Sequence, residues 1–213
     1  MTAPSQDKNT CRIYLIRHGA TNFNNARPAI LQGCRLNPAL SEEGRLQAEQ
    51  AGTMLADVPL TTVYSSPLLR AMETAECVAA THGLNVMPHE ELTEVDVGRW
   101  EGLTWPTIME RHPEEYQAFI HDAGRFPYLG GENLTDVHLR ATPFLRSLLE
   151  KHQGESIAVA GHNIVNRVFL LDVMERPFGE FRSIPQDNAA INVVRRKNGK
   201  DKVVTINSIL HLG

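Results

Sequence analysis

Short apolar runs alternate along this chain with longer segments whose apolar residues recur at helical spacing. The runs at 11–16 (CRIYLI), 61–65 (TTVYS) and 156–160 (SIAVA) are typical of buried strands. The segments at 41–56, 67–82, 132–152 and 163–174 are typical of amphipathic helices. Strands and helices that alternate in this way predict an α/β fold.

Capping residues set the predicted bounds of the first two helices. Ser41 is a suitable N-cap, and the two glutamates after it suit the positive end of a helix dipole. In the second helix, Ser66 is the predicted N-cap and Pro67 takes the first helical position. Gly83 is the predicted stop of that helix.

Residues 90–131 differ in composition from the rest of the chain. They contain both tryptophans and three prolines, with short helical patterns at 105–111 and 114–121. We expect a small helical cap that packs over the sheet. Trp100 and Trp105 are expected in the core of this cap rather than stacked on a substrate.

Two later features complete the predicted fold. Pro143 lies inside the helical segment 132–152 and predicts a kink, or two abutting helices. The runs at 189–195 and 202–206 flank an Asn-Gly pair, which is typical of a hairpin turn. Residues 1–213 are thus expected to form a single domain. Its predicted architecture is a three-layer α/β/α sandwich with a mostly parallel central sheet of five or six strands.

The overall composition is that of an ordinary globular protein. Of the 213 residues, 42% are apolar and 22% are charged, which excludes a disordered or fibrous chain. The net charge of −4 supplies no general attraction for nucleic acid or for an anionic membrane. We expect neither as a partner, so the basic residues of any site must be concentrated locally.

The cysteines and the apolar runs bear on the compartment. Three cysteines with no close pair indicate no disulfide framework, as in a reducing compartment. No apolar run reaches the roughly 18–20 residues that span a bilayer. The first nine residues are polar and lack the apolar core of a signal peptide. We expect a cytoplasmic protein whose residues 1–10 are frayed.

Two of the predicted strands end in a histidine beside a glycine. The run at 11–16 continues into RHG, which contains His18, and the run at 156–160 continues into GHN, which contains His162. A single histidine in such a turn is more often structural. In open α/β sheets, however, ligands collect at the carboxyl ends of strands. The pair therefore predicts a site in which the two imidazoles face each other.

The residues around His18 indicate an anionic ligand. Arg17 follows a buried strand, and an unpaired buried guanidinium is costly unless an anion binds it. Gly19 allows the backbone to approach such a ligand closely. Asn24, six residues after His18, can donate an amide N–H to the same anion.

Two further segments contribute one basic residue and several acidic residues. Arg70 lies in the first turns of a helix, where the dipole disfavours a cation unless an anion is near. The segment LTEVDVGRWEG holds Glu94, Asp96 and Glu101, one of which can act as a general acid above a basic pocket. Taken alone, Arg70 also fits a solvated surface residue, and the acidic segment also fits a surface loop.

The combined set suits a phosphoryl group better than a metal ion. The sequence contains no HxH, HExxH or clustered aspartates, and no GxxxxGKS/T, GxGxxG or GxSxG motif. Phosphoryl transfer depends mainly on positioning and positive charge. A neutral imidazole is a competent nucleophile toward phosphorus.

Four segments together resemble the histidine phosphatase superfamily, also called phosphoglycerate mutase-like. In chain order they are RHGATNFN, SSPLLRAMETA, LTEVDVGRWEG and VAGHNIVNR. The resemblance extends from about residue 11 to residue 213. It implies that His18 attacks phosphorus and becomes a phosphohistidine. It also implies that Arg17, Arg70 and His162 hold the phosphoryl oxygens.

The resemblance also implies roles for Asn24 and for a general acid, for which two positions are possible within the family. It implies that Asn24 assists in holding the phosphoryl group and that Glu94 protonates the leaving oxygen and later activates water. Some branches of the family place the acid at the position of Asp96, which is the alternative to Glu94. No metal ion or organic cofactor is implied.

The chain departs from the family pattern near the substrate loop and after the last histidine. By resemblance, Gln32, Gly33 and Asn163 contact the substrate. The loop continues as CRLNPALS, with Asn37 where relatives usually carry an aspartate. Asn163 stands where glycine is common.

A phosphatase is favoured over a mutase. Family mutases carry a larger insertion after the acid motif, and GGENLTDVHLR at 130–140 resembles the GGES-type segment of the phosphatase branch. A phosphoglycerate mutase is the alternative within the family. A non-catalytic phosphate-binding or regulatory module is the alternative of another class.

The expected substrate is a small phosphomonoester, such as the carboxylate-bearing phosphoserine. The ending INSILHLG resembles that of metal-independent phosphoserine phosphatases, which makes His211 a candidate contact for a substrate carboxylate. Another histidine of those enzymes is replaced here by Val97. A homodimer is common among relatives and is a further possibility for this chain.

Overall fold

The computed structural model describes residues 7–213, so most of the segment expected to be frayed, residues 1–6, lies outside it. A carboxylate oxygen of Asp7 accepts a hydrogen bond from the backbone of Asn9, and the other accepts one from the hydroxyl of Thr10. Thr10 is already the first residue of a strand. The expectation of a frayed end is therefore wrong at Thr10.

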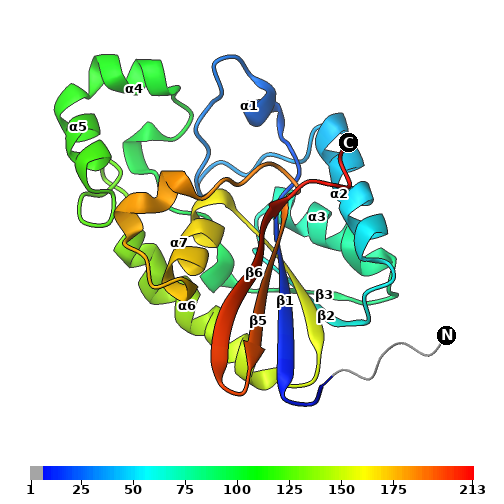
Figure 1. Ribbon diagram of the computed structural model, residues 1–213. Helices are drawn as coiled ribbons and strands as arrows, with labels where there is room; N and C mark the ends of the chain where they lie inside the picture. Colours follow the sequence, from blue (N-terminus) through cyan, green and yellow to red (C-terminus); the bar gives the residue numbers. More distant parts are fainter. Residues whose placement is uncertain (1–6) are drawn as a thin grey trace.

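Six strands of the described chain form one sheet, in the order β3-β2-β4-β1-β5-β6 (Figure 1). They are β1 (Thr10–Arg17), β2 (Leu60–Ser65), β3 (Val86–Pro88), β4 (Ser156–Gly161), β5 (Ile191–Lys197) and β6 (Lys200–Ser208). Strands β1 to β4 run parallel to one another, and β5 and β6 add an antiparallel hairpin beside β1. The expectations of a mostly parallel sheet and of a hairpin at the Asn-Gly turn are confirmed.

Most helices begin and end close to their predicted positions. They are α1 (Asn22–Asn25), α2 (Glu42–Leu55), α3 (Leu69–Ala80), α4 (Trp105–Arg111), α5 (Pro113–His121), α6 (Leu134–Lys151) and α7 (Asn163–Val173), with short 3-10 helices η1 (Glu90–Leu92), η2 (Gly98–Trp100) and η3 (Phe178–Ser183). Ser41 caps α2 through its side chain, as predicted. Helix α6 continues through Pro143, so two abutting helices do not occur there.

The start of α3 differs from the prediction. Ser66 and Pro67 lie before the helix, which begins at Leu69. The backbone N–H of Leu69 donates to Oδ1 of Asn37 at 2.7 Å, so the cap comes from a loop distant in sequence. Asn37 therefore satisfies a free N–H of the first turn, which a local serine does in most helices.

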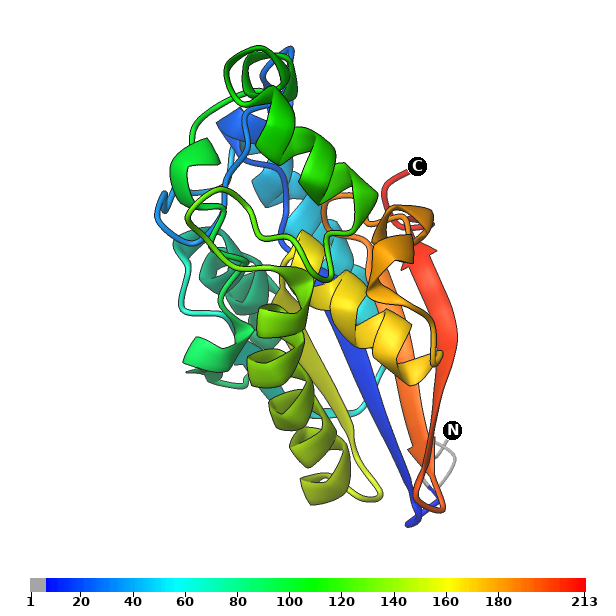
Figure 2. The same ribbon diagram turned by 90° about the vertical axis from the view of Figure 1, so that its left-hand side faces the viewer.

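Alternate residues of the central strands face two separate cores, as the period of a strand requires. Ile13 and Leu15 of β1 pack with α6 and α7, whereas Ile16 packs with α2 and α3. In β4, Ala158 and Ala160 join the second core. Helices therefore cover both faces of the sheet (Figures 1 and 2), which confirms the three-layer sandwich.

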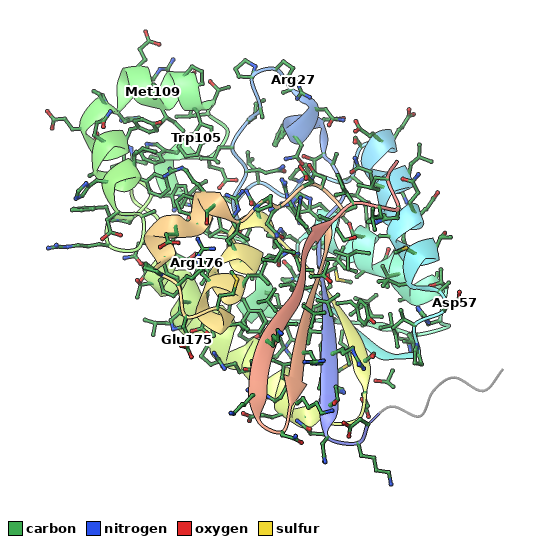
Figure 3. All side chains as sticks on the ribbon, viewed as in Figure 1. Arg27, Asp57, Trp105, Met109, Glu175 and Arg176 are labelled. Carbon is green, nitrogen blue, oxygen red and sulfur yellow. The ribbon has the colours of Figure 1, made fainter. Side chains whose placement is uncertain are left out.

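The cap is built on an aromatic cluster. Trp100 is fully buried and contacts Phe119 and Tyr128 edge-on, with ring centroids 5.6 and 5.9 Å away. The two cap helices α4 and α5 lie beyond the carboxyl end of β1 (Figure 1). Trp100 is thus cap core, as predicted. Trp105 is half-buried on the inner side of the cap (Figure 3), where it also lines a cavity.

Candidate active site

The two strand-end histidines lie side by side at the carboxyl ends of β1 and β4. These strands are parallel neighbours with Arg17 opposite Gly161. The backbone N–H of His18 donates to the carbonyl of Gly161 at 3.0 Å. The imidazole centroids of His18 and His162 are 5.3 Å apart. The sheet register therefore brings together two histidines that are far apart in sequence.

The hydrogen bonds of His18 define which ring nitrogen holds the proton. Nδ1 lies 2.7 Å from the carbonyl oxygen of Gly19, which can only accept. Nε2 lies 3.3 Å from Nε of Arg70, which can only donate. The proton therefore resides on Nδ1, and Nε2 carries the free lone pair.

Burial keeps both imidazoles neutral. Burial and the nearby charges of Arg70 and Arg17 hold the pKa of His18 well below its usual value. Burial, Arg70 and His18 do the same to the pKa of His162. Neither ring nitrogen of His162 has a hydrogen-bond partner among residues 7–213. Those nitrogens are available to a ligand at the strand ends.

Arg70 is fully buried behind His18 rather than solvated. Its two terminal nitrogens donate to the backbone carbonyls of Gly33 and Leu36, at 2.8 and 3.2 Å. Burial lowers the pKa of its guanidinium. The contacts fix Arg70 with its Nε toward His18, which excludes the surface interpretation of this arginine.

Arg17 is held by a network of buried amides. Its Nη1 donates to the carbonyl of Gln186 at 2.5 Å, while its Nε has no partner within residues 7–213. The side chain of Gln186 in turn bonds the amides of Asn166 and Asn192 at 2.8–3.2 Å. Burial lowers the pKa of Arg17 to about 10, which leaves the guanidinium charged at neutral pH. The unused Nε is free to donate to an anion.

The three carboxylates of the acidic segment lie in three different environments. Glu94 is 4% exposed, and its oxygens accept from the backbone N–H groups of Val95 and Ile164, at 2.9 and 3.2 Å. Ile164 lies in the first turn of α7, whose dipole favours a negative charge there. Asp96 instead forms an ion pair with Arg35 at 2.8 Å. Of these two alternatives, only Glu94 faces His18 across the same cavity.

The third carboxylate, Glu101, holds the backbone of the loop at residues 33–36. Its Oε1 accepts hydrogen bonds from the backbone of Gly33 at 2.7 Å and of Leu36 at 3.2 Å. The same two residues present their carbonyls to Arg70. Glu101 thus supports the arginine indirectly, through the loop backbone.

A cavity of about 480 Å³ opens beside His18. Its lining residues are Arg17, His18, Asn24, Ala29, Ile30, Leu31, Gln32, Glu94, Val95, Val97, Trp105, Tyr116, Ile120, Tyr128, Asn163, Ile164, Arg167, Phe181 and Arg182. Six predicted site residues are among them. Arg70, His162 and Gly33 are not: Arg70 and His162 are fully buried next to His18, and Gly33 contacts Arg70 through its carbonyl.

The polar loop residues keep free groups on the cavity. Nε2 of Gln32 and Oδ1 of Asn163 are buried and have no partner within residues 7–213. Oδ1 of Asn24 accepts from the backbone of Thr21, so its NH₂ group is the end left for a ligand. These groups supply donors and an acceptor around a bound molecule.

One predicted contact residue, His211, lies away from the cavity, and so does the loop residue Asn37. His211 does not line the cavity, and its Nε2 contacts the carbonyl of Ala189 at 3.1 Å. Asn37 does not line it either, because its side chain caps α3. The C-terminal histidine and the altered loop residue therefore lie outside the cavity, at structural contacts.

Sequence reasoning missed two arginines of the cavity, Arg167 and Arg182. Arg167 belongs to the segment VAGHNIVNR and lies four residues after Asn163, hence on the same face of α7. That spacing was the available signal. Arg182 lies in η3, where no periodic pattern marks a site. Its position follows from the tertiary fold alone.

No helix within residues 7–213 is both long and apolar enough to cross a bilayer. In the same part of the chain, His, Cys, Asp and Glu side chains form no group of three placed to hold a metal ion.

Several known proteins are similar to this chain in sequence or in fold over most of their length. Phosphoserine phosphatase 1 of Hydrogenobacter thermophilus is 29% identical over 202 residues, which cover 95% of this chain and 94% of that protein. Phosphoglycerate mutase-like protein 4 of Arabidopsis thaliana is 34% identical over 199 residues, which cover 92% and 84%. The solved structure of Bacillus stearothermophilus YhfR superposes with a TM-score of 0.87 at 28% identity, covering 95% of this chain and all of that one.

The family model for branch 1 of the histidine phosphatase superfamily matches residues 13–209. That span includes the RHG turn, the buried arginine of α3, the acidic segment and the second histidine. The chain therefore belongs to the histidine phosphatase superfamily, branch 1.

Proposed function

We propose that the protein hydrolyses small phosphomonoesters through a phosphohistidine on Nε2 of His18. The observation that carries this proposal is the state of that imidazole. Its proton is fixed on Nδ1 by Gly19, and its Nε2 lone pair lies beside the guanidinium of Arg70. Such a nitrogen is a neutral nucleophile at the point where an anionic phosphoryl group is attracted.

In the first step, the lone pair of His18 Nε2 forms a bond to phosphorus, and the ester P–O bond breaks. The carboxyl group of Glu94 gives its proton to the leaving oxygen, which departs as an alcohol. Arg17 and Arg70 supply positive charge to the phosphoryl oxygens, and His162 supplies a ring N–H. Asn24 assists from the facing loop. Positioning and charge of this kind dominate phosphoryl transfer.

In the second step, the carboxylate of Glu94 takes a proton from water, and the resulting hydroxide attacks phosphorus. The P–N bond breaks, its electron pair returns to His18, and inorganic phosphate leaves. Glu94 then holds the proton needed for the next cycle. The same carboxyl group serves both steps, which is consistent with its position across the cavity from His18.

The proposed substrate is a small phosphorylated metabolite, with phosphoserine as the first compound to test. The name of the Hydrogenobacter thermophilus relative supports this choice. Gln32, Gly33 and Asn163 belong to the proposed substrate site, Gly33 through its contact with Arg70. A phosphoglycerate mutase is the second candidate, because the Arabidopsis thaliana relative carries a mutase-like name.

The test is phosphate release from phosphoserine, phosphoglycerates, a sugar phosphate and a nucleotide, each with EDTA present. We expect one compound to be hydrolysed well above the others. Conversion of 3-phosphoglycerate to its isomer after priming with a bisphosphate, without net release, would favour the mutase instead. The absence of both reactions would favour a phosphate-binding module.

A further inference from the structure

The cavity contains two arginines that the proposed chemistry does not use. Arg167 of α7 and Arg182 of η3 both line it. The guanidinium group of each forms no hydrogen bond and no ion pair with another residue of the described chain. Nε of Arg167 is buried without any partner. A buried donor left unpaired by the protein is costly, so it indicates a group that a ligand or water can accept from.

Aromatic rings hold both guanidinium groups. Cζ of Arg182 lies 4.5 Å from the ring centroid of Phe181 and 5.6 Å from that of Phe119. Cζ of Arg167 lies 5.8 Å from the same Phe181 ring. Phe119 and Phe181 are themselves buried. Stacking on a fixed ring orients an arginine while leaving its N–H groups free for an anion.

The charges around Arg167 are mixed. Burial lowers the pKa of Arg167, the neighbouring Tyr128 and Glu94 raise it, and the charge of Arg182 lowers it. Glu94 is the single carboxylate of the cavity lining, and its oxygens already accept hydrogen bonds from the backbone of Val95 and Ile164. Arg167 is half-buried and Arg182 is exposed, and an anion bound between them would offset the repulsion of the two like charges.

These arginines are distinct from those that act on His18. The charges that lower the pKa of His18 are Arg70 and Arg17. The cavity lining also includes apolar and aromatic side chains, namely Leu31, Val97, Trp105, Tyr116, Ile120 and Tyr128. Its volume falls within the roughly 300–1,000 Å³ of small-molecule pockets, which is more than a phosphoryl group needs.

We propose that Arg167 and Arg182 form a second anion subsite of the substrate pocket. This inference rests on the proposed phosphatase function and specifies its substrate class. The preferred substrate is a phosphomonoester whose leaving group carries another anionic group, a carboxylate or a phosphate, beyond an apolar spacer. The phosphoryl group to be cleaved binds at His18, and the second anion binds at the two arginines.

The test compares substrates that differ only in the second anion. One pair is 3-(4-phosphonooxyphenyl)propanoate and 4-ethylphenyl phosphate, which have similar phenol leaving groups. The other pair is hexane-1,6-diol bisphosphate and hexyl phosphate. The first pair examines a carboxylate and the second a phosphate, and kcat/KM is measured for all four compounds.

We expect the wild type to prefer the anion-bearing member of at least one pair by about tenfold or more, since each tenfold step corresponds to about 1.4 kcal/mol. The double variant Arg167→Met/Arg182→Met should lose this preference. Its kcat/KM should fall much less for 4-ethylphenyl phosphate, which has no second anion, than for the anion-bearing partner of that pair. Arg111→Met removes an exposed charge from the cap outside the cavity, and it should leave the preference unchanged.

Three results would overturn the subsite. They are a wild type without preference in either pair, a double variant that loses both members equally, and an Arg111→Met variant that loses the preference. If no phosphate ester is hydrolysed, the proposed function itself fails. Calorimetry with 3-(4-hydroxyphenyl)propanoate then decides the subsite: binding that disappears in the double variant supports it, and any other result rejects it.

Discussion

Nε of Arg70 donates a hydrogen bond to Nε2 of His18 over 3.3 Å, from a guanidinium that is wholly buried. The arginine approaches the lone pair that the proposed mechanism uses. A fixed cation here opposes protonation of Nε2 and attracts the oxygens of an incoming phosphoryl group. The pair therefore links the neutral state of the nucleophile to the charge that binds its substrate.

Replacing the nucleophile should abolish turnover. His18→Ala is expected to lower kcat by at least about a thousandfold, because the phosphoenzyme route is lost. The check is acid-quench trapping of phosphoprotein together with steady-state phosphate release. His121→Ala changes a histidine of α5 outside the cavity lining and should behave as the wild type. Phosphoprotein in the His18→Ala variant would place the nucleophile elsewhere.

Replacing the proposed acid should affect poor leaving groups most. With Glu94→Gln, kcat/KM for phosphoserine should fall by about 10²–10⁴-fold, the usual contribution of general acid catalysis. For 4-nitrophenyl phosphate, whose leaving group needs little protonation, the loss should be much smaller. Asp96→Asn is the matched control, since Asp96 pairs with Arg35. Equal losses on both substrates in Glu94→Gln would argue against this role.

Removing the centre of the amide network should loosen Arg17. The amide of Asn192 bonds the carbonyl of Leu15 and both polar atoms of the Gln186 side chain. Asn192→Ala leaves these buried groups unpaired, at a cost of roughly 1–3 kcal/mol in unfolding free energy. We also expect weaker inhibition by inorganic phosphate, measured well below the unfolding temperature. Reduced stability with unchanged phosphate inhibition would limit the network to a structural role.

Acidification should destabilise the ligand-free protein. His18 and His162 have folded pKa values depressed below the unfolded value of 6.5, so the unfolded state binds more protons as the pH falls below 6.5. Their contribution to stability is full above pH 6.5 and is lost as the pH falls toward their folded pKa values. Each proton gives a slope of about 1.4 kcal/mol per pH unit.

Urea denaturation between pH 7.5 and 5 measures this slope. The variant His18→Asn/His162→Asn should show a shallower dependence than the wild type over the same range. Identical slopes in the two proteins would show that other groups cause the acid sensitivity.

Much of the candidate site could be predicted from the sequence because its residues lie in short contiguous segments. A histidine directly after a buried strand of a parallel sheet lies at the carboxyl edge of that sheet, independently of the conformation of the loops. His18 and His162 were predictable for that reason. The prediction of an anion at Arg17 followed from the cost of an unpaired buried charge, and the prediction for Arg70 followed from the helix dipole.

The sequence by itself determined the alternation of strands and helices, the sheet edge that carries the chemistry, and the family. Only the tertiary structure separates Glu94, which lines the cavity, from Asp96, which does not, because both lie in one loop and differ by long-range contacts with α7 and Arg35. It also placed His211 outside the cavity, assigned Asn37 to the start of α3 and brought Arg182 into the cavity lining. Contacts between segments distant in sequence leave no local periodic pattern, so these positions became known only from the folded chain.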